Sequence, residues 1–279
     1  MAFRKSSKAQ SLKLLTVELA LNNDNFVLTE KDADILIQVR SNSVMWHKEK
    51  MLNIAIKNLP IECTKICWLD CDLIFHNSNW VKETSKLLNK HDLVQPFSII
   101  MQTNKKGKVI NQSYGFGYHC KNAPHNVDHA DVGKNATWGF AWASKKSYIE
   151  KCGGFYDKNI VGGGDNIIKV NSGFTKLKPD SYSSGHLNDL NTYFLQNEQY
   201  KLKRKNISCT SGSVVHQWHG DHTNRGYGER YAILKECEYE PLNDIQINDS
   251  GCYEFTSQAK SKMLEEKIKI YFDSRKEDG

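Results

Sequence analysis

Two aspartates, Asp70 and Asp72, directly follow the apolar run at residues 66–69. Such a run is typical of a strand that is covered on both faces of a sheet. Residues two apart in an extended backbone point the same way, so the two carboxylates are expected to converge while Cys71 faces the opposite side. Converging carboxylates repel each other unless a cation separates them, and a hard divalent ion shared with substrate phosphates meets that need. A solvated strand end explains the pair equally well.

Two histidines, His216 and His219, form a second candidate group at the end of the segment 214–218. Residues three apart on a regular strand face opposite sides, so these imidazoles can share an ion only if the strand ends near Trp218. Gly220 favours such an end. Neutral imidazole binds manganese-like ions together with carboxylates, and the alternative is a pair of packed or hydrogen-bonded histidines. We expect the pair to ligate a metal.

A third candidate, Asp165, follows the glycines at residues 162–164. Consecutive glycines let the backbone approach a ligand closely and adopt positive φ. Because a helix is predicted to begin at Asp165, its carboxylate can serve as a general base beside a bound ligand. The alternative is a plain helix N-cap, a position that favours aspartate.

Trp46 and Lys48 stand where another helix is predicted to begin. An aromatic ring and a cation at that point can hold a nucleotide base and its phosphate, helped by the positive end of the helix dipole. A core tryptophan beside solvated lysines is the alternative interpretation.

The elements that must position these residues alternate along the chain. Apolar spacing predicts a strand over 34–40, a helix over 46–58, the strand before Asp70, a helix over 79–89 and a strand over 94–101. This alternation predicts a right-handed, parallel core. Polar residues rich in Gly, Asn and His predict loops around a site over 104–135, and residues 257–271 predict an amphipathic closing helix.

Composition narrows the class of protein. The chain has 279 residues, enough for one large α/β domain. It holds no apolar stretch long enough to span a membrane and no hydrophobic leader, so we expect an unprocessed protein of the cytosol. Eight cysteines without a Cys-x-x-Cys pair predict reduced thiols. The net charge of +6 favours anionic ligands, nucleotide diphosphates and nucleic acid alike.

Five segments, taken in order and spacing, resemble the successive motifs of the β-1,4-galactosyltransferase family. They are residues 46–53, 69–74, 138–155, 162–165 and 216–219, within the region 44–231. The resemblance implies an α/β GT-A fold, Rossmann-like, with a mixed but mainly parallel sheet flanked by helices and a loop-rich acceptor region. It implies one domain over 1–279, with a nucleotide-binding half near 30–100, an acceptor and metal half over 104–235 and a closing segment over 236–279.

The resemblance also implies a metal site. Asp72 and His219 fall on the family's metal ligands, and His216 falls on a second ligand position that is a methionine in the animal enzymes. A histidine there makes the site harder, so Mn²⁺ is expected, with greater tolerance of Mg²⁺.

The other implied roles concern the nucleotide sugar. Asp165 falls on the catalytic base, and Asp70 is expected at the nucleotide ribose. The full set expected to bind the donor is Trp46, Lys48, Asp70, Cys71, Gly163 and Gly164.

These roles predict an inverting transferase that moves a sugar from a UDP-sugar to an acceptor hydroxyl. Gly164 stands where the family has a glutamate that contacts sugar, so neither galactose as donor nor N-acetylglucosamine as acceptor follows. The family's membrane anchor is also missing, which favours a cytosolic enzyme of a bacterium or phage. A saccharide is the expected acceptor, and a protein or a hydroxylated DNA base is also possible. Trp138, Trp142 or Trp218 could stack on a sugar or on a base, so they do not decide between these acceptors.

Two other classes of protein remain open on the sequence. A metal-dependent hydrolase acting on nucleotide diphosphates would use the same Asp and His residues with metal-bound water. A non-catalytic module for nucleic acid or another anionic polymer would rest on the basic charge alone.

Overall fold

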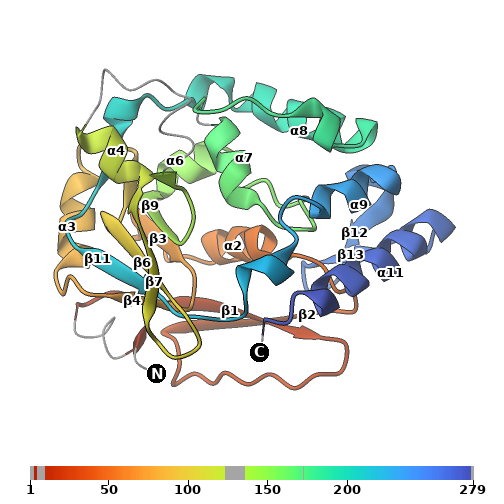
Figure 1. The fold of residues 1–279 in the computed structure, drawn as a ribbon, viewed down its shortest axis with the longest axis horizontal. Helices are drawn as coiled ribbons and strands as arrows, with labels where there is room; N and C mark the ends of the chain where they lie inside the picture. The colour runs from red at the N-terminus through yellow and green to blue at the C-terminus, as the bar shows by residue number, and fades with distance from the viewer. Residues whose placement is uncertain (1–2, 5–9, 123–135, 172, 278–279) are drawn as a thin grey trace.

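The protein is described by a computed structural model that covers residues 3–4, 10–122, 136–171 and 173–277. It has a mixed α/β architecture, which confirms the expected class (Figure 1). The elements of the first half are β1 (Leu15–Leu21), β2 (Ile35–Ser41), α2 (Lys48–Lys57), β3 (Lys65–Leu69), β4 (Leu73–Phe75), α3 (Trp80–Leu87), β5 (Leu93–Gln95), β6 (Ile99–Thr103), β7 (Val109–Gly115) and α4 (Phe116–Asn122).

The second half of the chain is richer in helices. Its elements are β8 (Ala136–Thr137), β9 (Ala141–Lys145), α6 (Lys146–Lys151), α7 (Gly164–Asn171), α8 (Ser184–Gln196), β10 (Ile207–Cys209), β11 (Ser213–His216), α9 (Arg230–Glu236), α10 (Pro241–Asp244), β12 (Ile245–Ile247), β13 (Tyr253–Phe255) and α11 (Ala259–Ser274). Four short 3₁₀ turns lie between them, at 179–181, 198–200, 204–206 and 222–225.

The sheets are mixed, and the prediction of a mainly parallel sheet is wrong. One sheet has the order β10-β5-β9-β3 and another the order β4-β11-β6-β7-β8. In the first, β9 runs antiparallel to both β5 and β3; in the second, parallel and antiparallel pairs alternate. Strand β2 pairs in parallel with β1 in a separate two-stranded sheet. Strand β3 pairs with β9, which lies more than seventy positions later in the chain. The local alternation of strand and helix does not reveal this pairing.

Helix α2 lies in the middle of the molecule, with β1 and β2 below it and α7 and α8 above it in Figure 1. Its apolar residues recur at helical spacing, and it ends at Lys57, shortly before Pro60, as predicted. This central place brings the first turn of α2 into contact with later parts of the chain. Residues on its first turn therefore lie inside the molecule even though a helix terminus is usually exposed.

Two predictions about the middle of the chain need correction. The single strand predicted over 94–101 is divided into β5 and β6, because Pro96 has no N–H for a sheet and the chain changes sheets there. Within the predicted loop region 104–135, residues 109–122 form β7 and α4 instead. Strand β7 pairs with β6 as a hairpin, and the part of this prediction over 123–135 lies outside the described residues.

The closing helix α11 is confirmed. Leu264, Ile268 and Tyr271 are buried, and the first two pack in one cluster with residues of α9 and β13. Met263, expected on the same face, is 45% exposed instead. Among the described residues, no helix is both long and apolar enough to cross a membrane. All eight cysteines are free thiols, as the composition predicts.

Candidate active site

The pairing of two strands places Asp72 beside His216. Strand β11 runs antiparallel to β4, with His216 opposite Leu73, and Asp72 immediately precedes Leu73. The Gln217 N–H donates to the Asp72 carbonyl oxygen at 3.0 Å, which extends the ladder by one residue. The strand then ends, and Gly220 adopts a φ of +93°. The turn that the sequence requires for His219 to return toward His216 is therefore present.

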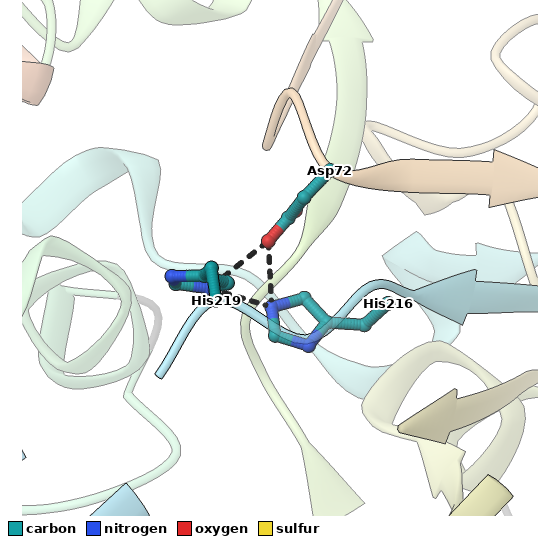
Figure 2. A group of neighbouring side chains, drawn as sticks. All are labelled: Asp72, His216 and His219. Atoms are coloured by element: carbon teal, nitrogen blue, oxygen red, sulfur yellow. Dashed lines mark hydrogen bonds and ion pairs between the residues drawn. The ribbon is translucent and has the colours of Figure 1, made fainter. Parts of the chain in front are cut away.

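Asp72, His216 and His219 converge on one point (Figure 2). Oδ2 of Asp72 lies 2.9 Å from Nε2 of His216 and 3.0 Å from Nε2 of His219. The two Nε2 atoms are 3.2 Å apart. The convergence predicted for these three side chains is confirmed, whereas their binding of a metal stays a prediction.

These three side chains fit a divalent cation. Ligand atoms at right angles around an ion about 2.1 Å away are about 3.0 Å apart, close to the separations found here. Oδ1 of Asp72 is buried and has no hydrogen-bond partner among the described residues, so it is an acceptor that a cation could use. One carboxylate and two imidazoles are a donor set suited to Mn²⁺ and related ions.

The charges around this cluster favour ionised Asp72 and neutral His219. Burial opposes ionisation of Asp72, but the two histidines lower its pKa below the ordinary value. Burial and the neighbouring Arg225 guanidinium lower the pKa of His219. Arg225 Nη2 donates to His219 Nε2 at 2.9 Å, the nitrogen that faces Asp72. A metal ion at this point requires the Arg225 side chain to move away from that nitrogen.

Asp70 takes a different direction from Asp72. Strand β3 ends at Leu69, and residues 70–72 form a turn rather than regular strand, so the predicted convergence of the two carboxylates is wrong. Asp70 forms an ion pair with Lys48 of helix α2. Its N–H donates to the Phe140 carbonyl at 2.8 Å, and Cys71 is exposed between the two aspartates. The turn thus presents one carboxylate to each of two neighbouring clusters.

The second cluster begins at the first turn of α2. Trp46 Nε1 donates to Glu49 Oε2 at 2.8 Å, and the Trp46 N–H donates to the Ile160 carbonyl at 2.8 Å. Burial opposes a charged Lys48, but Asp70, Asp165 and Glu49 around it raise its pKa. The predicted nucleotide residues Trp46, Lys48 and Asp70 therefore lie together in the fold, with Glu49 among them.

The glycine loop at 162–164 packs directly against this helix end. Gly162 and Gly163 have φ of +87° and +99°, which only glycine adopts readily. Asn159 Nδ2 fixes the loop by donating to the Gly162 carbonyl at 2.7 Å and to the Tyr231 hydroxyl at 2.9 Å. A Cβ at Gly162 would lie 3.2 Å from the Trp46 ring. The loop can approach Trp46 this closely because it lacks side chains.

Asp165 lies in the first turn of α7, one residue inside the helix, and is not its N-cap. A Cβ at Gly139 would lie 3.1 Å from Asp165 Oδ2, so glycine at 139 leaves room for the carboxylate. Burial and the nearby Asp70 raise the pKa of Asp165 to about 6, although Lys48 and Arg230 oppose the shift. A carboxylate of this pKa is suited to general base catalysis near neutral pH.

Residues 139 and 140 connect the two clusters. Gly139 contacts Asp165, and the Phe140 ring lies 4.8 Å from the His216 ring, at 66° to it. Phe140 has a φ of +81°, an uncommon conformation for a bulky residue. Such backbone strain persists where the surrounding structure holds it, and here the Phe140 carbonyl accepts from Asp70. The strained residue lies between the carboxylate of one cluster and the imidazole of the other.

Three charged residues of the site escaped sequence analysis. Glu49 is only 8% exposed, Arg225 contacts His219, and Arg230 of α9 lies over the Gly162–Gly163 backbone, where a Cβ at either glycine would lie 2.8–3.2 Å from its guanidinium. Glu49 directly follows Lys48, so the sequence already placed it beside a candidate residue. Nothing in the residue pattern indicated the arginines.

Two of the three tryptophans considered for stacking are unavailable. Trp138 and Trp142 are 8% and 1% exposed and belong to the core cluster with Trp68 and Phe116. Trp218 is only partly buried, and Lys105 Nζ lies 5.2 Å from the centre of its ring. Stacking on a ligand by Trp138 or Trp142 is therefore excluded in this structure.

The segment 275–277 contacts both clusters. The Arg275 guanidinium lies 5.5 Å from the centre of the Trp46 ring. Glu277 Oε1 lies 3.8 Å from His219 Nδ1 and 2.5 Å from Arg275 Nη2. A Cβ at Gly220 would lie 2.8 Å from the Lys276 carbonyl oxygen. The end of the described chain thus borders the cluster of Asp72, His216 and His219 on one side and the cluster around Trp46 and Lys48 on the other.

Comparison with protein-family models finds none that matches this chain, and comparison with curated proteins finds no matching sequence.

Proposed function

We propose that the protein is a metal-dependent, inverting glycosyltransferase of the GT-A type that uses a UDP-sugar. The observation that carries this proposal is the meeting of Asp72, His216 and His219 within 4.8 Å at one end of a turn whose other end, Asp70, joins Lys48. A group of metal ligands beside a lysine and a tryptophan suits a nucleotide diphosphate sugar. The motif resemblance supports the choice of UDP and of the GT-A fold.

Asp72, His216 and His219 would hold Mn²⁺ or Mg²⁺, whose charge would stabilise the diphosphate as it leaves. Lys48, close to Asp70, would supply a second positive charge on the nucleotide side. Trp46, partly buried against the glycine loop and beside the Arg275 guanidinium, would contact the base. Tyr231 and Arg230 fill the space beside Gly163, and Glu49 fills the space beside Gly164, so the donor would meet these side chains rather than the glycine backbone.

Asp165 would take the proton of the attacking acceptor hydroxyl. Its pKa of about 6 leaves most of the carboxylate ionised at neutral pH and still basic enough to accept a proton as the oxygen–carbon bond forms. Because the attack comes from the side opposite the leaving diphosphate, the configuration at the sugar carbon inverts. The bond from that carbon to the diphosphate oxygen breaks as the new glycosidic bond forms.

The test begins with the donor. Thermal unfolding with UDP, UDP-glucose, UDP-galactose and their N-acetylated forms, each with and without Mn²⁺, should show stabilisation that requires both nucleotide and metal. Steady-state assays with saccharide acceptors then measure transfer against UDP release. Metal-dependent UDP release that no acceptor stimulates would instead show a hydrolase. An affinity for nucleic acid that falls steeply with salt concentration and does not change when UDP is added would show a polymer-binding module.

A further inference from the structure

Glu49 is a buried carboxylate for which the proposed reaction above assigns no role. It lies on the first turn of α2, is 8% exposed, and accepts a hydrogen bond from Trp46 Nε1 through Oε2. A buried carboxylate is costly unless its oxygens are paired. The nearby Lys48 and one indole N–H only partly offset the cost of burying this carboxylate. The position of Glu49 therefore needs an explanation beyond packing.

Gly164 is shaped around the Glu49 carboxylate. A Cβ at Gly164 would overlap Oε1 of Glu49 and would lie 2.5 Å from its Cδ. Any other residue at 164 would force the Glu49 side chain away. Since Gly164 has an ordinary helical backbone, its lack of a side chain serves this close contact rather than an unusual φ.

Glu49 also shares the electrostatic surroundings of the proposed base. Asp165 follows Gly164 in the chain; Asp165 and Lys48 both affect the ionisation of Glu49, and Lys48 also affects that of Asp165. Glu49 thus lies between Trp46 and Lys48, the proposed nucleotide contacts, and Asp165, the proposed base. In a donor substrate, the group between the nucleotide and the point of attack is the sugar being transferred.

We propose that Glu49 binds hydroxyl groups of the transferred sugar and determines which UDP-sugar the protein accepts. This inference rests on the proposed function. A carboxylate accepts hydrogen bonds from two hydroxyls at once, and a buried one discriminates strongly against a sugar whose hydroxyl points elsewhere, because its charge would then be left unpaired. Gly164 supports this role by leaving Glu49 room to reach the loop.

The experiment compares the wild type with Glu49→Gln, which keeps the size of the side chain and the Trp46 hydrogen bond but removes the charge. Glu62→Gln is the matched control, because Glu62 is exposed and forms an ion pair with Lys13, far from the site. Each variant is measured for UDP binding with Mn²⁺ by calorimetry, and for kcat/KM with UDP-glucose, UDP-galactose and their N-acetylated forms.

We expect Glu49→Gln to bind UDP with a Kd within about 2-fold of wild type, while kcat/KM for the preferred donor falls about 10- to 100-fold and the preference between epimers shrinks. Glu62→Gln should change neither. Unchanged donor preference in an active Glu49→Gln protein would overturn the inference. An equal loss of UDP binding would also overturn it, by showing that Glu49 only holds Trp46. A wild type without UDP-sugar binding or transfer would instead refute the proposed function itself.

Discussion

The protein has two neighbouring charged clusters, and they are built in different ways. We call Asp72, His216 and His219 the metal cluster, and the acidic residues around Lys48 the carboxylate cluster. Asp72, His216 and His219 meet because two strands pair in a defined register and a glycine turn returns the chain. Asp165 and Glu49 fit into the fold because Gly139 leaves space beside the first and Gly164 beside the second. The first cluster depends on which side chains are present, and the second on which are absent.

The two clusters also differ in how their charge is balanced. In the metal cluster a single carboxylate faces two imidazoles, and one of its oxygens has no partner. In the carboxylate cluster, Glu49, Asp70 and Asp165 surround Lys48, with Arg230 nearby. The first arrangement is incomplete without a cation. The second already contains its cations and tunes the proton affinity of its acids, so the two regions should respond differently to mutation.

The largest expected effect is on the metal cluster. Asp72→Ala removes the only carboxylate among the three converging side chains, so both metal-dependent UDP binding and transfer should be lost. A metal supplies several kcal/mol to such a reaction, so kcat/KM should fall by more than about 10,000-fold. Calorimetry with Mn²⁺ and UDP, together with a transfer assay, measures both losses. Retained Mn²⁺-dependent UDP binding would show that the cluster is not the metal site.

A smaller effect, confined to turnover, is expected from the other cluster. Asp165→Asn keeps the shape of the side chain but removes the base, so kcat should fall about 100- to 10,000-fold. UDP binding with Mn²⁺ should stay close to wild type, in contrast to Asp72→Ala. Transfer at near the wild-type rate would assign the base to another residue and remove the functional difference between the clusters.

The pH dependence should report the carboxylate cluster. The raised pKa of Asp165, about 6, means that its carboxylate is protonated and inactive as a base at lower pH. kcat/KM should therefore fall about tenfold per pH unit below 6 and level off above it. In the Asp165→Asn protein this limb should disappear. A limb that persists unchanged in that variant would belong to a different group.

The same cluster should affect stability. Burial raises the pKa of Glu49 to about 7, above its value in the unfolded chain. Between about pH 4.5 and 7 the unfolded chain releases this proton first, so the folded state loses stability as pH rises through that window. Glu49→Gln should remove a loss on the order of 3 kcal/mol between pH 4.5 and 8, measured by urea unfolding. An identical pH profile in the variant would refute the shift.

The smallest effect concerns the space that Gly164 leaves for Glu49. Gly164→Ala should lower the free energy of unfolding by about 1–3 kcal/mol, because overpacking forces a buried side chain to move. Gly228→Ala is the control, since a Cβ there meets nothing within 4 Å and its φ is not positive; it should stay within about 0.5 kcal/mol. Equal effects at the two glycines would argue against the close contact.

Sequence analysis found the residues whose types carry chemistry. The convergence of Asp72, His216 and His219 follows from strand ends and a glycine turn, both visible locally. Sheet direction was mispredicted, because the antiparallel pairing of β3 with β9 depends on residues far apart in the chain. The different directions of Asp70 and Asp72 also escaped the alternation rule, since that rule applies to regular strand and the two residues lie in a turn.

The residues that the sequence did not reveal share one property. Glu49 and Arg230 gain their place through contact with glycines, and the space beside a glycine is known only once the backbone is folded. Trp138 and Trp142 illustrate the reverse case, because their types suited stacking but the fold places them in the core. Residue type can suggest chemistry, whereas access and neighbours depend on the tertiary structure.

The segment 275–277 has a practical consequence for dissecting the two clusters. Arg275 lies over Trp46, Glu277 approaches His219, and Lys276 packs on Gly220. Shortening the chain after Ser274 would disturb both regions in a single step. Truncation therefore cannot separate them, and an affinity tag or fluorophore intended to leave catalysis intact should be kept away from this segment.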